Sequence, residues 1–141
     1  MKSDNYMPSI INYFQSCLIR AKALWNDQDI ELNELFACFE NYKFTWCQGG
    51  TARNIGDVLL HIDDNHLADA GVWFQTAIET DIKNGMRLQV AMDHACYTEW
   101  FKKKDDGTGV KEQLTKAIDI FRECGADGWV EKYEKELALV F

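Results

Sequence analysis

Four side chains near the middle of the chain have the chemistry that metal binding needs. His61, Asp63, Asp64 and His66 place two imidazoles and two carboxylates within six residues. Structural zinc takes four convergent ligands, and the two histidines are five residues apart, which differs from the four-residue spacing of a helical metal pair. We interpret the cluster as a solvated helix end, with Asp64 or Asn65 capping the next helix. The sequence therefore predicts no stoichiometric zinc.

A second group, Asp93, His94 and Cys96, has the residue types of a nucleophile and its base. Residues two apart on a helix point to different sides, so His94 and Cys96 are not expected to meet. His94 is interpreted as a partly buried, hydrogen-bonded residue. The segment 105–109 lacks the length and acidic spacing of a calcium loop and is typical of a turn between helices. We expect no enzymatic activity, no cofactor and no metal.

Composition limits the partners. The 141 residues carry a net charge of -8, which repels nucleic acid and anionic lipid, and the basic run 102–104 is followed at once by two aspartates. The five cysteines are odd in number and form no C-x-x-C pair, which is typical of reduced thiols. With neither a secretion signal nor a long apolar run, we expect a cytoplasmic protein that binds no nucleic acid and no membrane.

Apolar residues recur at helical spacing in seven segments. Pro8 is the sole proline, which favours long helices. The predicted helices span residues 9–26, 30–46, 51–63, 66–84, 86–104, 109–124 and 126–139. Thr51 is expected to cap the third, and Gly85 and Gly125 to end the fourth and sixth.

The core-facing stripes follow from this spacing. The third segment contributes Ile55, Val58, Leu59 and Ile62. The fourth contributes Leu67, Ala70, Phe74, Ala77, Ile78 and Ile82, and the sixth Val110, Leu114, Ala117, Ile118 and Phe121. Five phenylalanines are in register with a core stripe: Phe14, Phe36, Phe39, Phe74 and Phe121.

The chain also repeats itself. One constant shift along the sequence places Ala77-Ile78 on Ala117-Ile118 and Gly85 on Gly125. Each unit is interpreted as a helical hairpin, and stacked hairpins bury a continuous core. We predict one all-α domain over residues 1–141, a tetratricopeptide-like superhelix of about seven helices. Its hairpins are about 9–46, 51–84 and 86–124, and the helix 126–139 caps it, with Trp129 docked inward.

Several stretches resemble a known family. They are Gly56 to Ile62, Ala77-Ile78, Asn84 to Arg87 and Glu123 to Ala138. They resemble the C-terminal tetratricopeptide-like repeats of large bacterial signalling ATPases, which often carry adenylate or guanylate cyclase or protein kinase domains. The chain lacks the G-x-x-x-x-G-K-[ST] loop of an ATPase. The resemblance therefore implies a regulatory scaffold, with an ATPase, cyclase or kinase domain of the same system as its partner.

A binding face is predicted on the inner wall of the superhelix, along the third and fifth segments. The shift that aligns Gly85 with Gly125 also brings Arg53 onto Asp93, which places the two segments side by side. The expected partner-binding residues are Asn54, Asp57, His61, Asp93, Tyr97, Trp100 and Lys104. A nearly equally weighted alternative is that Trp100 packs against a neighbouring hairpin.

Two functions follow from this architecture. The first is a protein–protein interaction module that grips a peptide or a neighbouring domain. The second is a structural module that forms homo-oligomers through apolar ends such as Leu139-Val140-Phe141.

Overall fold

Helical periodicity produces the expected all-helical architecture. The computed structural model describes residues 7–26, 29–40, 42 and 45–140, and these residues form seven α-helices and no strand. The helices are α1 (Met7–Leu24), α2 (Leu32–Ala37), α3 (Gln48–Ile62), α4 (Leu67–Lys83), α5 (Arg87–Lys103), α6 (Gly107–Glu123) and α7 (Asp127–Leu137). Two short 3-10 turns, η1 (Thr45–Cys47) and η2 (Asp64–His66), precede α3 and α4.

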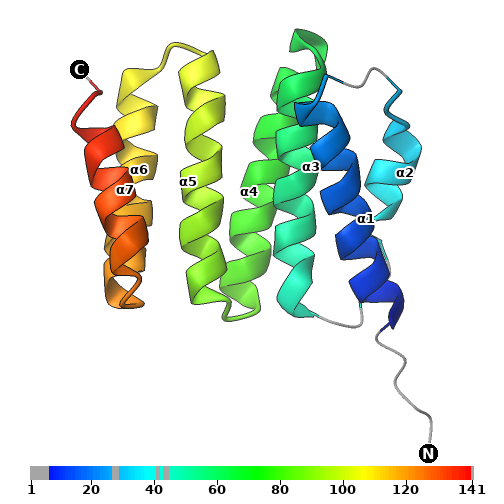
Figure 1. Ribbon diagram of the computed structural model, residues 1–141, viewed down its shortest axis with the longest axis horizontal. Coiled ribbons are helices and arrows are strands. Elements are labelled where there is room, and N and C mark those ends of the chain that lie inside the picture. The colour runs from blue at the N-terminus through cyan, green and yellow to red at the C-terminus, as the bar shows by residue number, and fades with distance from the viewer. Residues whose placement is uncertain (1–6, 27–28, 41, 43–44, 141) are drawn as a thin grey trace, which may run out of the picture.

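The helices stack as antiparallel hairpins. Helix α3 pairs with α4 and α5 with α6, while α4 packs on α5 and α6 on α7. Helices α1, α3, α5 and α7 form a front row, and α4 and α6 lie behind it (Figure 1). The main contacts of α1 are with α3, so the first helix extends the front row at one end. This is the stacked-hairpin order that the sequence predicts.

The helix ends confirm the predicted repeat. The shift that takes Gly85 to Gly125 also takes both ends of α4 onto the ends of α6, and the start of α5 onto the start of α7. Gly85 and Gly125 both have a φ of 70°, the left-handed conformation that ends helices. In both turns the next amide bonds to a carbonyl five residues earlier, Met86 to Asp81 and Ala126 to Phe121, at 2.9 Å. The turns that follow the two hairpins therefore have the same backbone geometry.

The first hairpin differs from the prediction. Helix α2 covers six residues, where the sequence predicted a helix over 30–46, and positions 41, 43 and 44 lie outside the described residues. Thr51 is not a cap, because α3 begins at Gln48 and the buried Thr51 hydroxyl bonds to the Tyr42 hydroxyl and the Cys47 carbonyl. Gly49 lies inside α3, where a side chain would not fit, because a Cβ there would be 2.1 Å from Cγ of Asp81. The glycine is therefore explained by the close approach of α4 and not by the end of a helix.

The predicted stripes form most of the core. All five members of the α6 stripe are buried, as are Ile55, Val58 and Leu59 of α3 and Phe74 of α4. Two expectations are wrong. Ile82 is 60% exposed in the last turn of α4, and Phe14 is 64% exposed because α1 turns its opposite face to the core. Of the described helices, none has both the length and the apolar character that a membrane span requires.

Trp129 docks less deeply than the sequence predicts. Its ring stacks on Phe121 at 5.8 Å and on Tyr133 at 5.9 Å, but the residue remains 39% exposed. Phe121 beneath it is fully buried. The cap therefore depends more on Phe121 than on Trp129.

Truncation of these two rings should separate their contributions. Trp129→Ala should lower the free energy of unfolding by about 1 to 2 kcal/mol, because part of the ring already faces water. Phe121→Ala should cost roughly 3 to 5 kcal/mol, because it leaves a cavity in the core. Urea titrations followed by circular dichroism measure both, and equal losses would contradict the partial exposure of Trp129.

Candidate functional site

Two of the predicted wall residues on α3 are covered by α1. Asn54 is buried and donates to the Ser16 hydroxyl at 3.0 Å. Asp57 is buried and pairs with Nε of Arg20 at 2.5 Å. The expectation that these residues face solvent is wrong, because the front row continues through α1 and its polar side chains meet those of α3.

His61 is the α3 residue of this set that remains exposed. Its Nδ1 lies 2.7 Å from the Asp57 carbonyl, one helical turn back. The ring therefore stays close to its own helix near the α3 C-terminus.

The predicted residues of α5 are distributed over several neighbours. Tyr97 is 5% exposed and stacks on Phe74 at 5.5 Å. Trp100 packs on α4, where its Nε1 donates to the Leu67 carbonyl at 2.7 Å and its ring covers Gly71. The alternative that Trp100 packs against a neighbouring hairpin is thus confirmed. Lys104 is exposed, with its ammonium 4.1 Å from the Trp100 ring centroid.

Asp93 belongs to a buried ionic cluster between α3, α4 and α5. Arg53 Nη1 donates to Asp93 Oδ1 at 2.7 Å, and Nη2 donates to Oε1 of Gln89 at 3.1 Å. This contact confirms the predicted side-by-side placement of α3 and α5. Asp81 of α4 completes the cluster, and both aspartates are fully buried.

The two aspartates resist full ionisation. The charge of Asp81 acts on Asp93 at short range, and no described group donates a hydrogen bond to the Asp81 oxygens or to Asp93 Oδ2. Two neighbouring buried carboxylates repel each other, so one of them favours its protonated form. Burial raises the pKa of Asp93 to about 8, against the attraction of Arg53, and Asp81 raises it further. Burial also raises the pKa of Asp81.

The repeat shows what this cluster replaces. One repeat further along the chain, Asp81 corresponds to Phe121 and Asp93 to Tyr133. Those two rings stack with centroids 5.7 Å apart and their planes 5° from parallel. The same position between hairpins is therefore filled by an apolar stack in one interface and by a buried acid pair with an arginine in the other. The sequence shift alone contained this signal, since it aligns acids with aromatic residues.

The histidine and cysteine clusters form no metal or nucleophile site among the described residues. His66 bonds through its amide and its Nδ1 to Asp63, so Asp63, and not Asp64 or Asn65, caps the turn before α4. His61 bonds to its own helix instead. In the part of the chain that the structure describes, no three metal-ligating side chains converge. Of the segment 105–109, residues 105 and 106 form the predicted turn, whereas Gly107 already begins α6, which Asp106 caps by accepting from the Gly109 amide.

His94 and Cys96 are directed apart, as predicted. Nδ1 of His94 lies 2.7 Å from Oε1 of Gln113 on α6, and burial lowers the His94 pKa. Burial raises the pKa of Cys96 to about 11. This thiol is therefore protonated at neutral pH and is a poor nucleophile. Of the remaining cysteines, Cys124 is exposed.

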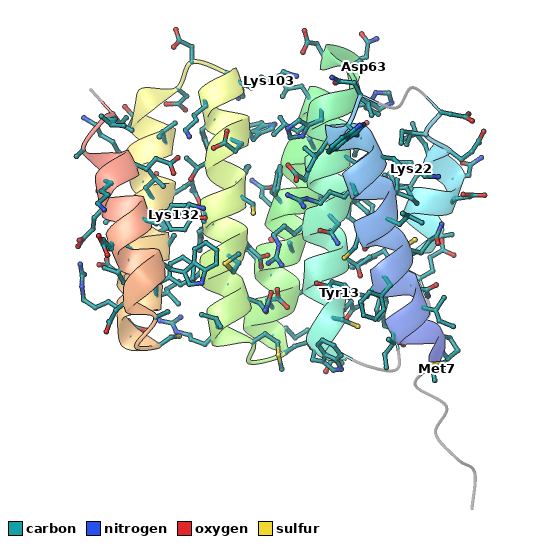
Figure 2. All side chains as sticks on the ribbon, in the orientation of Figure 1. Met7, Tyr13, Lys22, Asp63, Lys103 and Lys132 are labelled. Atoms are coloured by element: carbon teal, nitrogen blue, oxygen red, sulfur yellow. The ribbon has the colours of Figure 1, made fainter. Side chains whose placement is uncertain are left out.

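An open hollow lies between α3 and α5, near the C-terminal ends of both helices. A depression of about 430 Å³ is lined by Leu60 and His61 of α3 and by Glu99, Lys102 and Lys103 of α5. Lys103 donates to the Leu60 carbonyl at 2.8 Å and pairs with Asp64 at 3.0 Å. Figure 2 shows Lys103 and Asp63 at the same end of the molecule. Sequence reasoning assigned His61 to a binding wall but missed the other four residues, which become neighbours only when α3 and α5 align.

Comparisons of the chain with protein-family models, curated proteins and solved structures find no match. The candidate site therefore rests on the geometry of this chain alone.

The raised pKa of Asp93 predicts how stability depends on pH. An unfolded aspartate titrates near pH 4, roughly, whereas Asp93 titrates at about 8 in the fold. The folded chain thus keeps a proton that the unfolded chain releases, and this contribution to the unfolding free energy falls as pH rises between these values.

Asp81→Asn isolates this effect, because a neutral amide can donate to Asp93 at every pH. The variant should equal the parent near pH 4 and exceed its unfolding free energy by about 1 to 3 kcal/mol at pH 8. Asp93→Asn is the control and should destabilise the fold, since it leaves Arg53 buried without its counter-ion. Urea titrations at several pH values measure the difference, and a difference that does not change with pH would contradict the raised pKa of the acid pair.

Proposed function

We propose that this chain is a non-catalytic protein–protein interaction module that acts as a regulatory scaffold in a bacterial signalling protein. The proposal places it in the cytoplasm. Stacked hairpins support this function, because such arrays offer an extended surface to a peptide or a domain. The partner class that the resemblance implies is an ATPase, cyclase or kinase domain of the same system, with no nucleic acid or membrane involved.

The observation that carries the proposal is the hollow between α3 and α5. It offers about 430 Å³ and combines the exposed His61 with both signs of charge. The residues first expected to contact a partner on this wall are mostly buried, and they hold the wall together instead. The hollow includes one accessible residue of the predicted face, His61.

The cations of the hollow are held in place before any partner arrives. Lys102 bridges Glu99 at 2.7 Å and Glu136 of α7 at 2.5 Å. Lys103 is fixed by the Leu60 carbonyl and by Asp64. Ordered charges lose little entropy on binding and select the orientation of a bound segment. This arrangement suits an extended peptide with polar and acidic groups.

The second candidate is an oligomerisation module that packs through its apolar ends. Leu139 after α7 is 75% exposed, which favours this function. Phe141, the aromatic residue of that end, lies outside the described residues.

Affinity capture followed by binding measurements with the purified partner tests the first candidate. His61→Ala and Lys103→Ala remove accessible groups from the hollow, and each should weaken binding by roughly tenfold. Glu112→Ala is the matched control, because Glu112 is exposed on α6 in the back row and pairs with its neighbour Lys116. It should bind as the parent does.

Folding must be checked by circular dichroism, and the buried Tyr97 and Trp100 are unsuitable probes because their truncation damages the core. If both hollow variants bind like the parent while Glu112→Ala does not, the assignment of the partner to the front row is wrong.

A further inference from the structure

The outer face of α1 carries the largest concentration of exposed apolar side chains in the described chain. Phe14 is 64% exposed, and Trp25, directly after the helix, is 88% exposed. The Trp25 amide still bonds to the Ala21 carbonyl at 3.1 Å, so Trp25 continues the helical geometry. The exposed residues that share this face, here called the α1 stripe, are Met7, Ile11, Phe14, Leu18, Ala21 and Trp25.

The spacing of the α1 stripe is that of a coiled-coil seam. Its members follow one another in alternating steps of four and three residues over the whole helix. The buried residues Ser9, Ser16 and Ala23 lie on the opposite side of α1 and face the core. The helix is therefore apolar on the face that points away from its own domain, which is the pattern of a helix with a second partner.

The charge around the α1 stripe favours a second copy of this chain. Residues 7–26 contain two charged side chains, Arg20 and Lys22, in a chain of net charge -8. Arg20 is engaged by Asp57, so Lys22 is the remaining charge, and Figure 2 shows it on α1 toward the end opposite to Met7. Two copies that met through this face would bring no carboxylate of α1 against another, although the chain as a whole is acidic.

We propose that the α1 stripe is the interface of a symmetric dimer, in which α1 packs antiparallel on α1 of a second copy. A large apolar side chain presents about 200 Å² when fully exposed. With the exposures of this face, the stripe offers roughly 700 Å² per copy, close to the roughly 800 Å² that each partner gives to a standard interface.

The antiparallel arrangement matches side chains by size. Because the stripe is symmetric about its middle, Phe14 of one copy lies opposite Leu18 of the other, and Ile11 lies opposite Ala21. Large residues thus meet smaller ones, as close packing at a seam requires. The two-fold axis passes between Phe14 and Leu18, which makes Phe14 the central contact. The dimer goes beyond the proposed partner binding, since it uses no residue of the hollow between α3 and α5.

Sedimentation equilibrium over a roughly hundredfold range of concentration tests the dimer. The parent should reach twice the 16.3 kDa of one chain. Phe14→Lys should raise the dimer dissociation constant by roughly a hundredfold, and Trp25→Lys by roughly tenfold. Lysine lowers the net negative charge, so general repulsion between copies cannot explain the loss. Circular dichroism should be unchanged, since both side chains are exposed.

The matched control is Ile82→Lys, which puts the same charge at an exposed apolar residue of α4 and should dimerise like the parent. A parent that sediments as one chain at every concentration overturns the proposal. A dimer that neither Phe14→Lys nor Trp25→Lys weakens also overturns it, and would direct attention to Leu139 at the other end. Trp25 lies beyond the end of α1, so the dimer dissociation constant of Trp25→Lys still tests the proposal if Phe14→Lys unfolds.

Discussion

The fold depends on the burial of apolar stripes of the paired helices against the next hairpin. No hairpin in this array can bury its stripe alone, so each helix pair needs its neighbour. The turns at Gly85 and Gly125 support this order, because the same left-handed residue and the same five-residue carbonyl bond connect one hairpin to the next element in both places. Everything on the surface, including the hollow and the α1 stripe, is positioned by this repeated stacking.

The two interfaces of the array use different chemistry at equivalent positions. Phe121 and Tyr133 supply stacked rings, while Asp81 and Asp93 supply a pair of carboxyl groups that need a proton and an arginine. A buried ionic group of this kind adds little net stability, but it leaves the wrong neighbour with an unpaired charge. We therefore expect the ionic interface to favour contact among α3, α4 and α5 over contact with a copy of α6 and α7.

Local periodicity explains why much of the fold was predictable, and dependence on a covering element explains the errors. The α6 stripe, from Val110 to Phe121, is apolar at every fourth or third position, and the structure buries all of it. Asn54 has the polarity of a surface residue, yet α1 supplies Ser16 as its partner. Phe14 has the apolarity of a core residue, yet the core needs the opposite face of the same helix. The hollow was missed for the same reason, because its lining comes from α3 and α5, which α4 separates along the chain.

The order of contacts has a consequence for how the chain folds. The main contacts of each helix are with helices next to it or next but one along the chain. The loops that must close are therefore short, which favours rapid folding with little entropy lost before the first native contacts form. This local pattern of contacts also allows the helices at the two ends of the array to unfold while the central helices stay folded. Amide hydrogens of α1 and α2 should exchange with solvent well before those of α4 and α5, so the domain loses its structure from its ends inward.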